Sequence, residues 1–206
     1  MSPRPYRLGQ RQAAADATRA RILAAAHEIL TARAGFAGFT VDAVARQAGV
    51  ARMTVYYQFG SKVGLLEGVC DALAARGGIE QVAAVFQQPQ ALDALAEFVG
   101  VLGRFYEAER SLILRLHGLA AFDPDIEQVI RARGERRRHG LEVLLRRLSK
   151  EHGRPTRKGF AEALQILFTL TSFETLDALA GPGRSTAEVA PLVRRLALAA
   201  LDLEKG

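Results

Sequence analysis

Apolar residues recur along this chain at spacings of three and four, which places their side chains on one face of an α-helix. A clear short example is the stripe formed by Val41, Val44, Ala45 and Ala48. No stretch of useful length alternates apolar and polar residues in the way that a half-buried strand does. The pattern therefore predicts an all-α protein.

Residues 40–62 predict two short helices joined by a tight turn. Thr40 is a suitable N-cap, and Asp42 falls in the first turn, where the helix dipole favours a negative charge. Gly49 is placed to end the first helix, and the second is expected from residue 52 or 53 to Phe59. Two short helices joined in this way form a helix-turn-helix, whose second helix enters the major groove of DNA.

The same spacing predicts helices before and after this pair. A longer helix is expected to begin at Asp16 or Thr18 and to end near Gly35. Two starts are well marked: Asp123-Pro124 supplies a cap and a first-turn proline, and Ser185 with Glu188 forms a capping box. The remaining helices are expected over about 61–76, 79–87, 90–108, 110–121, 124–151, 156–180 and from 185 onward.

Positive charge is concentrated at one end of the chain. The net charge is +6, and residues 1–62 carry nine cations against three anions. The remaining nineteen cations and nineteen anions cancel. A basic segment that coincides with a helix-turn-helix indicates binding to a polyanion such as DNA. Charge alone would equally suit a solvated basic tail.

Two further basic segments leave alternatives open. Residues 1–15 hold two prolines and few apolar anchors, and they are predicted to form a flexible basic arm. This arm either reaches phosphates or a minor groove beside the main site, or contacts nothing specific. The arginines of residues 131–138 resemble a second nucleic-acid patch, but we interpret them as a solvated helix face because that part of the chain is neutral overall.

Other chemistry is weakly supported by the sequence. The single cysteine, Cys70, excludes an intrachain disulfide and suits a reducing cytoplasm. No long uncharged apolar run predicts a membrane span, and the N-terminus does not read as a signal peptide. His27, His117, His139 and His152 show no metal-ligand spacing to each other or to Cys70. No catalytic residue, metal site or cofactor is therefore predicted.

Residues 18–66 resemble the tetracycline-repressor (TetR/AcrR) family of bacterial transcriptional regulators. The resemblance is carried by Phe39-Thr40, Ala45, Ala48-Gly49-Val50, Val55-Tyr56, Phe59, Lys62 and Leu65-Leu66. The chain departs from the family at Ala51, where a capping serine is common, and at Val63-Gly64, where a polar or acidic pair is usual. The resemblance implies a three-helix helix-turn-helix DNA-binding domain over residues 16–66. It also implies a larger helical ligand-binding and dimerisation domain over residues 67–206.

The resemblance further implies which side chains contact double-stranded DNA. Arg52 is the expected base reader, since arginine pairs with guanine through two hydrogen bonds, and Met53 is expected to pack on a thymine methyl group. The other expected contacts are to phosphates, although Tyr56 could instead occupy a core position with its hydroxyl at the surface. The whole predicted set is Thr40, Arg52, Met53, Thr54, Tyr56, Tyr57 and Lys62.

The C-terminal part is expected to provide a dimer interface and a ligand cavity. The last two predicted helices are apolar on more than one side, which suits a homodimer interface, although a buried helical hairpin would share the pattern. A mainly apolar cavity for a small apolar or aromatic effector is predicted, although residues of these types are more often ordinary core. Its expected lining is Phe98, Leu102, Tyr106, Leu114, His117, Phe122 and Phe168.

The sequence thus predicts a dimeric repressor that a small molecule releases from a palindromic operator. One alternative is a DNA-binding dimer without a small-molecule effector, such as an architectural protein. An enzyme with an appended DNA-binding domain would need a polar catalytic cluster, and none is recognisable in the sequence.

Overall fold

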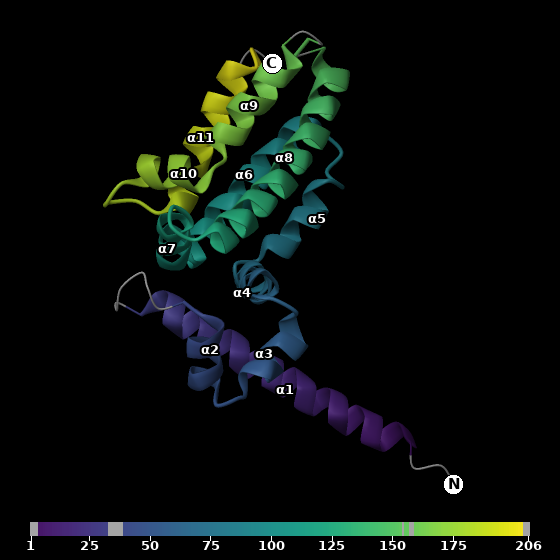
Figure 1. The fold of residues 1–206 in the computed structure, drawn as a ribbon. Helices are drawn as coiled ribbons and strands as arrows, with labels where there is room; N and C mark the ends of the chain where they lie inside the picture. The colour runs from purple at the N-terminus through teal and green to yellow at the C-terminus, as the bar shows by residue number, and fades with distance from the viewer. Residues whose placement is uncertain (1–3, 33–38, 154, 157–158, 204–206) are drawn as a thin grey trace. The chain divides into compact units, whose positions relative to one another are not determined.

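The fold is known from a computed structural model that describes residues 4–32, 39–153, 155–156 and 159–203, with side chains from residue 9 onward. Across these residues the regular elements are all helices, which confirms the predicted all-α class (Figure 1). The chain divides into two compact units: residues 1–72 with 114–129, and residues 73–113 with 130–206. Phe36, expected to fill the small N-terminal core, lies outside the described residues.

The first helix, α1, spans Arg4–Thr31 and begins well before the predicted start at Asp16 or Thr18. Thr18 does not cap it, because its hydroxyl donates to the carbonyl of Ala14 at 2.9 Å from within the helix. Three consecutive alanines precede Asp16 and favour helix strongly, so the cap-like residues are internal. Helix propensity at the start of α1 thus outweighs the presence of potential caps at Asp16 and Thr18.

The helix-turn-helix is confirmed as α2 (Val41–Ala48) and α3 (Arg52–Phe59), followed by α4 (Lys62–Arg76). α2 packs against both α1 and α3. The apolar residues of α1 and α4 supply much of the core of this unit, together with three buried side chains of α2 and one of α3. Fully or almost fully buried residues of this core include Ile22, Ala26, Val44, Val55, Leu65 and Leu66.

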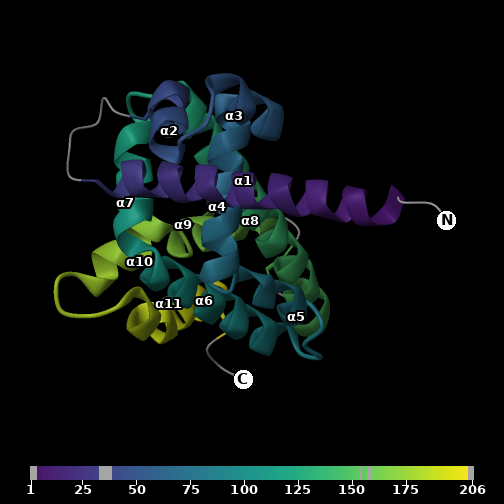
Figure 2. The ribbon, with the colours of Figure 1, turned by 90° about the horizontal axis from the view of Figure 1, so that it is seen from below.

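The second unit is built mainly from helices that surround an apolar core, with α6 and α11 packed most closely together (Figure 2). The starts predicted at Asp123-Pro124 and at Ser185 are confirmed by their caps. The elements after α4 are η2 (Ile79–Gln81), α5 (Val82–Val85), α6 (Ala91–Ala108), α7 (Arg110–Ala120), α8 (Pro124–His152), α9 (Phe160–Leu170), α10 (Phe173–Ala180) and α11 (Thr186–Ala200).

The continuous helix predicted over residues 156–180 is wrong, because the chain breaks between α9 and α10. Ser172 leaves the helical conformation, with φ −71° and ψ 155°, and its side chain accepts a hydrogen bond from the backbone N–H of Thr175. The carbonyl of Thr171 instead accepts a hydrogen bond from the Tyr106 hydroxyl at 3.2 Å. A local cap and a tertiary hydrogen bond therefore replace the helical ones, which periodicity alone does not reveal.

Two glycines of α6 provide a matched test of its packing against α11. A methyl group at Gly103 would lie 2.9 Å from the carbonyl oxygen of Thr186 and 3.2 Å from the Cα of Ala187, neither of which is a flexible side-chain end. We expect Gly103→Ala to lower the free energy of unfolding by about 1–3 kcal/mol. Urea denaturation at a fixed protein concentration measures this change.

Gly100→Ala is the control in the same helix. Its methyl group would meet only the end of the Arg104 side chain, at 3.3 Å. We expect this variant to be neutral or to gain up to about 1 kcal/mol from helix propensity. Equal stability changes in the two variants would contradict the close α6–α11 packing.

Candidate nucleic-acid interface

The start of α2 and the turn after it are held by local hydrogen bonds. Thr40 accepts a hydrogen bond through Oγ1 from the backbone N–H of Ala43 at 3.1 Å, so it is the predicted N-cap. Gly49 adopts a left-handed conformation, with φ 63° and ψ 40°, and Val50 N–H donates to the carbonyl of Ala45 at 3.0 Å. A side chain at position 49 would strain this turn, which sets the direction in which α3 leaves.

The recognition helix α3 presents large side chains to solvent. Met53 and Tyr57 are 71% and 88% exposed, whereas Val55 is buried against the rest of the unit. Thr54 and Tyr56 are half-buried. Ala51 offers no side-chain cap, so α3 lacks the capping side chain that is common in the family. Apolar and aromatic groups exposed at this density are unusual unless a partner covers them.

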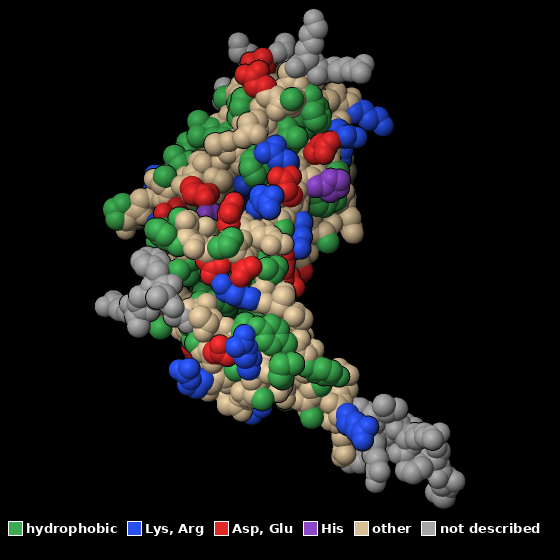
Figure 3. Space-filling view, viewed as in Figure 1, with side chains coloured by type: hydrophobic (Ala, Val, Ile, Leu, Met, Phe, Trp, Pro, Cys, Tyr) green, Lys and Arg blue, Asp and Glu red, His purple; other side chains and the backbone are tan. Residues whose placement is uncertain are grey.

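The positive charge that is concentrated in residues 1–62 of the sequence is also visible on the surface (Figure 3). On the face drawn in Figure 3, Lys and Arg side chains predominate over the part formed by α1–α3, whereas acidic and basic side chains are mixed over the rest. A cationic surface around α3 is the electrostatic arrangement expected for binding to a phosphate backbone.

Arg52, the first residue of α3, is held by two side chains. Its Nη1 donates to Asp42 Oδ2 at 3.1 Å, and its Nη2 donates to the hydroxyl of Tyr56 at 3.2 Å. The guanidinium carbon also lies 5.5 Å from the centre of the Tyr56 ring. The hydrogen bond to Tyr56 and the charge of Asp42 raise the pKa of Arg52 above its usual value.

Lys62, the first residue of α4, lies against two carboxylates. Its Nζ is 2.5 Å from Asp123 Oδ2 and 3.3 Å from Asp125 Oδ2. Partial burial lowers the pKa of Lys62, but hydrogen bonds and charge from Asp123 and Asp125 outweigh this effect and raise the pKa overall. A phosphate contact by Lys62 therefore requires its ammonium group to leave these carboxylates or to be shared with them.

Arg19 of α1 has a positional role that the sequence did not reveal. Its Nη1 donates to the carbonyl of Gln58 at 2.9 Å, and its guanidinium carbon lies 4.3 Å from the centre of the Phe59 ring. Arg19 thereby ties α1 to the end of α3 instead of extending freely toward phosphates. The residues are 39 and 40 positions apart, so no local spacing marks them as partners.

The residues predicted to line a ligand cavity occupy different environments. Phe98, Leu102 and Tyr106 are buried in the core of the second unit, where burial raises the pKa of Tyr106. Leu114 and Phe122 belong to the first unit and are 55% and 83% exposed.

The other two predicted cavity residues are half-buried. His117 belongs to the first unit. Phe168 belongs to the second, where the guanidinium carbons of Arg137 and Arg138 lie 4.3 and 4.1 Å from the centre of its ring. Phe168 therefore packs both against the apolar core of this unit and against charged side chains of α8.

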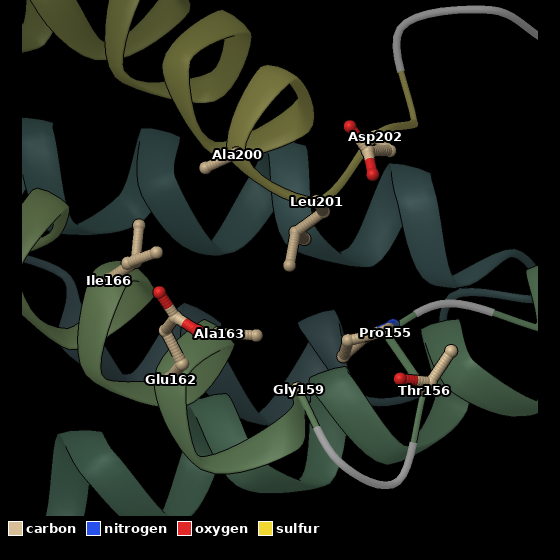
Figure 4. A pocket seen from close by; sticks show the side chains of 9 residues that line it. All are labelled: Pro155, Thr156, Gly159, Glu162, Ala163, Ile166, Ala200, Leu201 and Asp202. Carbon is tan, nitrogen blue, oxygen red and sulfur yellow. The ribbon is translucent and has the colours of Figure 1, made fainter.

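A pocket of about 250 Å³ lies between the start of α9 and the end of α11 (Figure 4). Leu201 and Ala163 contribute apolar surface, and Glu162 and Asp202 contribute carboxylates. None of the predicted cavity residues lines it. Its complete lining is Pro155, Thr156, Gly159, Glu162, Ala163, Ile166, Ala200, Leu201 and Asp202.

Within the described residues, no three His, Cys, Asp or Glu side chains gather in a way that would hold a metal ion. The described helices also include none that combines the length and apolarity needed to cross a membrane.

Comparisons with known proteins agree with this arrangement. The family model of bacterial regulatory proteins, tetR family, matches residues 22–69, which include all of α2 and α3. A comparison with curated protein sequences gives no match.

Several solved structures share the fold over most of their length. The transcriptional regulator FadR from Bacillus subtilis, in complex with stearoyl-CoA, has a TM-score of 0.68 at 19% identity, covering 88% of this chain and 98% of that chain. A TetR transcription regulator from Haloarcula marismortui has a TM-score of 0.64 at 19% identity, and the match covers 91% of this chain and 97% of that chain. A protein from Saccharomonospora viridis in complex with choline has a TM-score of 0.59 at 19% identity, and the match covers 88% of this chain and 95% of that chain. Residues 22–69, which contain the helix-turn-helix, therefore match the tetR family of bacterial regulatory proteins, and the chain shares its fold with solved transcriptional regulators over most of its length.

Proposed function

We propose that this protein is a homodimeric transcriptional repressor of the cytoplasm that binds a palindromic operator and is released from it by a small molecule. The observation that carries the proposal is the exposed face of α3, with Arg52 at its start and Met53 and Tyr57 projecting into solvent. In this proposal Arg52 reads guanine and Met53 packs on a thymine methyl group. Thr40, Thr54, Tyr56, Tyr57 and Lys62 contact phosphates.

The proposed dimer forms through α9, α10 and α11. The outer side of α11 exposes Leu196, Ala199 and Ala200, and α9 leaves Leu164 and Ile166 half-buried. Covering these groups with a second copy would remove apolar surface from water. Such a dimer would place two copies of α3 on successive major grooves, roughly 34–36 Å apart.

The proposed effector acts through the second unit. Of the similar structures, one is in complex with stearoyl-CoA and another with choline, so proteins of this fold accept chemically different small molecules. We propose an apolar or aromatic effector for this chain, bound within the second unit among Phe98, Leu102, Tyr106 and Phe168. A fatty acyl-CoA that raises the melting temperature and lowers operator affinity would support this proposal, and indifference to apolar compounds would count against it.

The DNA-binding part of the proposal is tested by fluorescence anisotropy with duplex DNA from just upstream of the protein's own gene. Measurements at two salt concentrations, with scrambled duplex as competitor, separate specific from non-specific binding. Tight binding that resists the competitor is the expected result. Weak binding that any duplex displaces would favour an operator elsewhere or an architectural role.

The carboxylates beside Lys62 lead to a separate prediction. Because Asp125 competes with phosphate for Lys62 and also repels DNA, we expect Asp125→Asn to raise the affinity for any duplex by roughly 2- to 5-fold. The dependence of log K on log salt should steepen by up to about one unit. Anisotropy titrations at several salt concentrations measure both quantities.

Asp93→Asn is the charge-matched control, since Asp93 lies exposed in the first turn of α6 within the other unit. We expect this variant to leave DNA affinity unchanged. A double variant that combines Asp125→Asn with Lys62→Met should lose the increase in duplex affinity. If it keeps the gain, Lys62 is not the cation that Asp125 withholds from DNA.

A further inference from the structure

The two contacts of Arg52 come from different elements of the helix-turn-helix. Asp42 belongs to the first turn of α2, ten residues before Arg52, whereas Tyr56 follows one turn later within α3. The guanidinium group is thus held from α2 on one side and from α3 on the other. An arginine at the start of an exposed helix would otherwise sample many rotamers.

The remaining donors of Arg52 are sufficient for base recognition. A guanidinium group has five N–H donors, and the described contacts use one on Nη1 and one on Nη2. These two contacts leave three N–H groups unused: one on Nη1, one on Nη2 and the one on Nε. Guanine presents two acceptors, O6 and N7, in the major groove, so two of these donors can bind it while Asp42 and Tyr56 stay in place.

An ion pair this exposed contributes little to stability. The side chains of Arg52 and Asp42 are each more than half exposed, and such pairs are weakened by solvent and salt. Asp42 also offsets the attraction of Arg52 for the phosphate backbone, which would be a disadvantage if Arg52 served only as a phosphate contact. The arrangement instead favours a function in which the orientation of Arg52 matters more than its net charge.

We propose that Asp42 is a positioning residue that sets base specificity: by holding Arg52 in place before DNA is bound, it favours guanine opposite Arg52 and reduces binding to other sequences. This inference rests on the proposed function, because it requires α3 to lie in the major groove. Its energetic basis is that a side chain already held in the bound orientation loses less conformational freedom on binding.

Selection of bound duplexes from a random-sequence pool tests the inference. The wild-type chain defines the preferred site, and Arg52→Ala identifies the position at which the guanine preference depends on Arg52. We expect Asp42→Ala to lower the preference for guanine at that same position by roughly 3- to 10-fold. Affinity for unrelated duplex should rise by roughly 2- to 3-fold, because a negative charge is removed from the interface.

Two further variants separate positioning from a merely structural or electrostatic effect. Glu28→Ala removes the same charge from the same unit and breaks another contact to α2, that between Glu28 Oε2 and Gln47 Nε2 at 2.8 Å. It should leave the guanine preference intact. Asp42→Asn keeps an oxygen acceptor for Arg52 and should retain more of the preference than Asp42→Ala.

The outcomes distinguish this inference from the proposed function. Suppose that the wild-type chain selects a site and that Arg52→Ala loses the preference for guanine at one position of it. If Asp42→Ala keeps that preference, the inference is overturned while the proposed function stands. The inference is also overturned if Glu28→Ala reduces the preference as much as Asp42→Ala does. If the wild-type chain enriches no sequence at all, the proposed function itself fails.

Discussion

Replacing Arg52 with alanine should lower affinity for the operator by about 5- to 150-fold per half-site, the range expected when a two-hydrogen-bond contact to guanine is lost. Arg52 lies at the exposed start of α3 and is held by Asp42 and Tyr56, so its removal eliminates a prepared base contact. Affinity for unrelated duplex should fall much less, by the roughly 2- to 3-fold expected when one positive charge is removed from the interface. Anisotropy titrations with operator and with scrambled duplex measure the two effects separately.

Arg46→Ala is the matched control for this variant. Arg46 is exposed in the last turn of α2, and its removal takes the same charge from the same helix-turn-helix. We expect Arg46→Ala to weaken binding to operator and to scrambled duplex by the same factor. If Arg52→Ala also weakens both equally, Arg52 contributes charge to the interface and not base recognition.

Introducing aspartate at Leu196 should separate the proposed dimer and lower operator affinity by about 10²- to 10⁴-fold, since the second half-site would no longer be bound intramolecularly. Leu196 is 40% exposed on α11 and belongs to the proposed interface. A buried, unpaired carboxylate on both copies would oppose association. Sedimentation velocity measures the change in mass, and anisotropy measures the loss of affinity.

Leu114→Asp makes the same substitution on α7, where the side chain is 55% exposed and lies outside the proposed interface. This control should leave the mass unchanged. A monomeric wild-type protein, or a Leu196→Asp variant that keeps the wild-type mass, would contradict the proposed interface.

The sequence predicted the helix-turn-helix well because its signals are local. Thr40 and Gly49 act through backbone groups a few residues away, so their spacing alone shows where α2 begins and ends. The capping box at Ser185 and the cap at Asp123 are local in the same sense. The comparison with known families agrees over residues 22–69.

The features that the sequence did not reveal depend on groups far apart in the chain. The break between α9 and α10 involves Tyr106, which is 65 residues away from Thr171. The carboxylates around Lys62 lie 61 and 63 positions further along, so the pairing arises only from the fold. The early start of α1 was missed for another reason, since Asp16 and Thr18 would suit a cap as well as an internal position.

The central claim is that two copies of this chain read a symmetric DNA site together through α3. The most direct measurement compares the affinity of the wild-type protein for its selected operator with that for the same duplex carrying five additional base pairs between the half-sites. This insertion turns one half-site to the opposite face of the duplex, so the account predicts a loss of about 10²- to 10⁴-fold. Equal affinity for the two duplexes would contradict it.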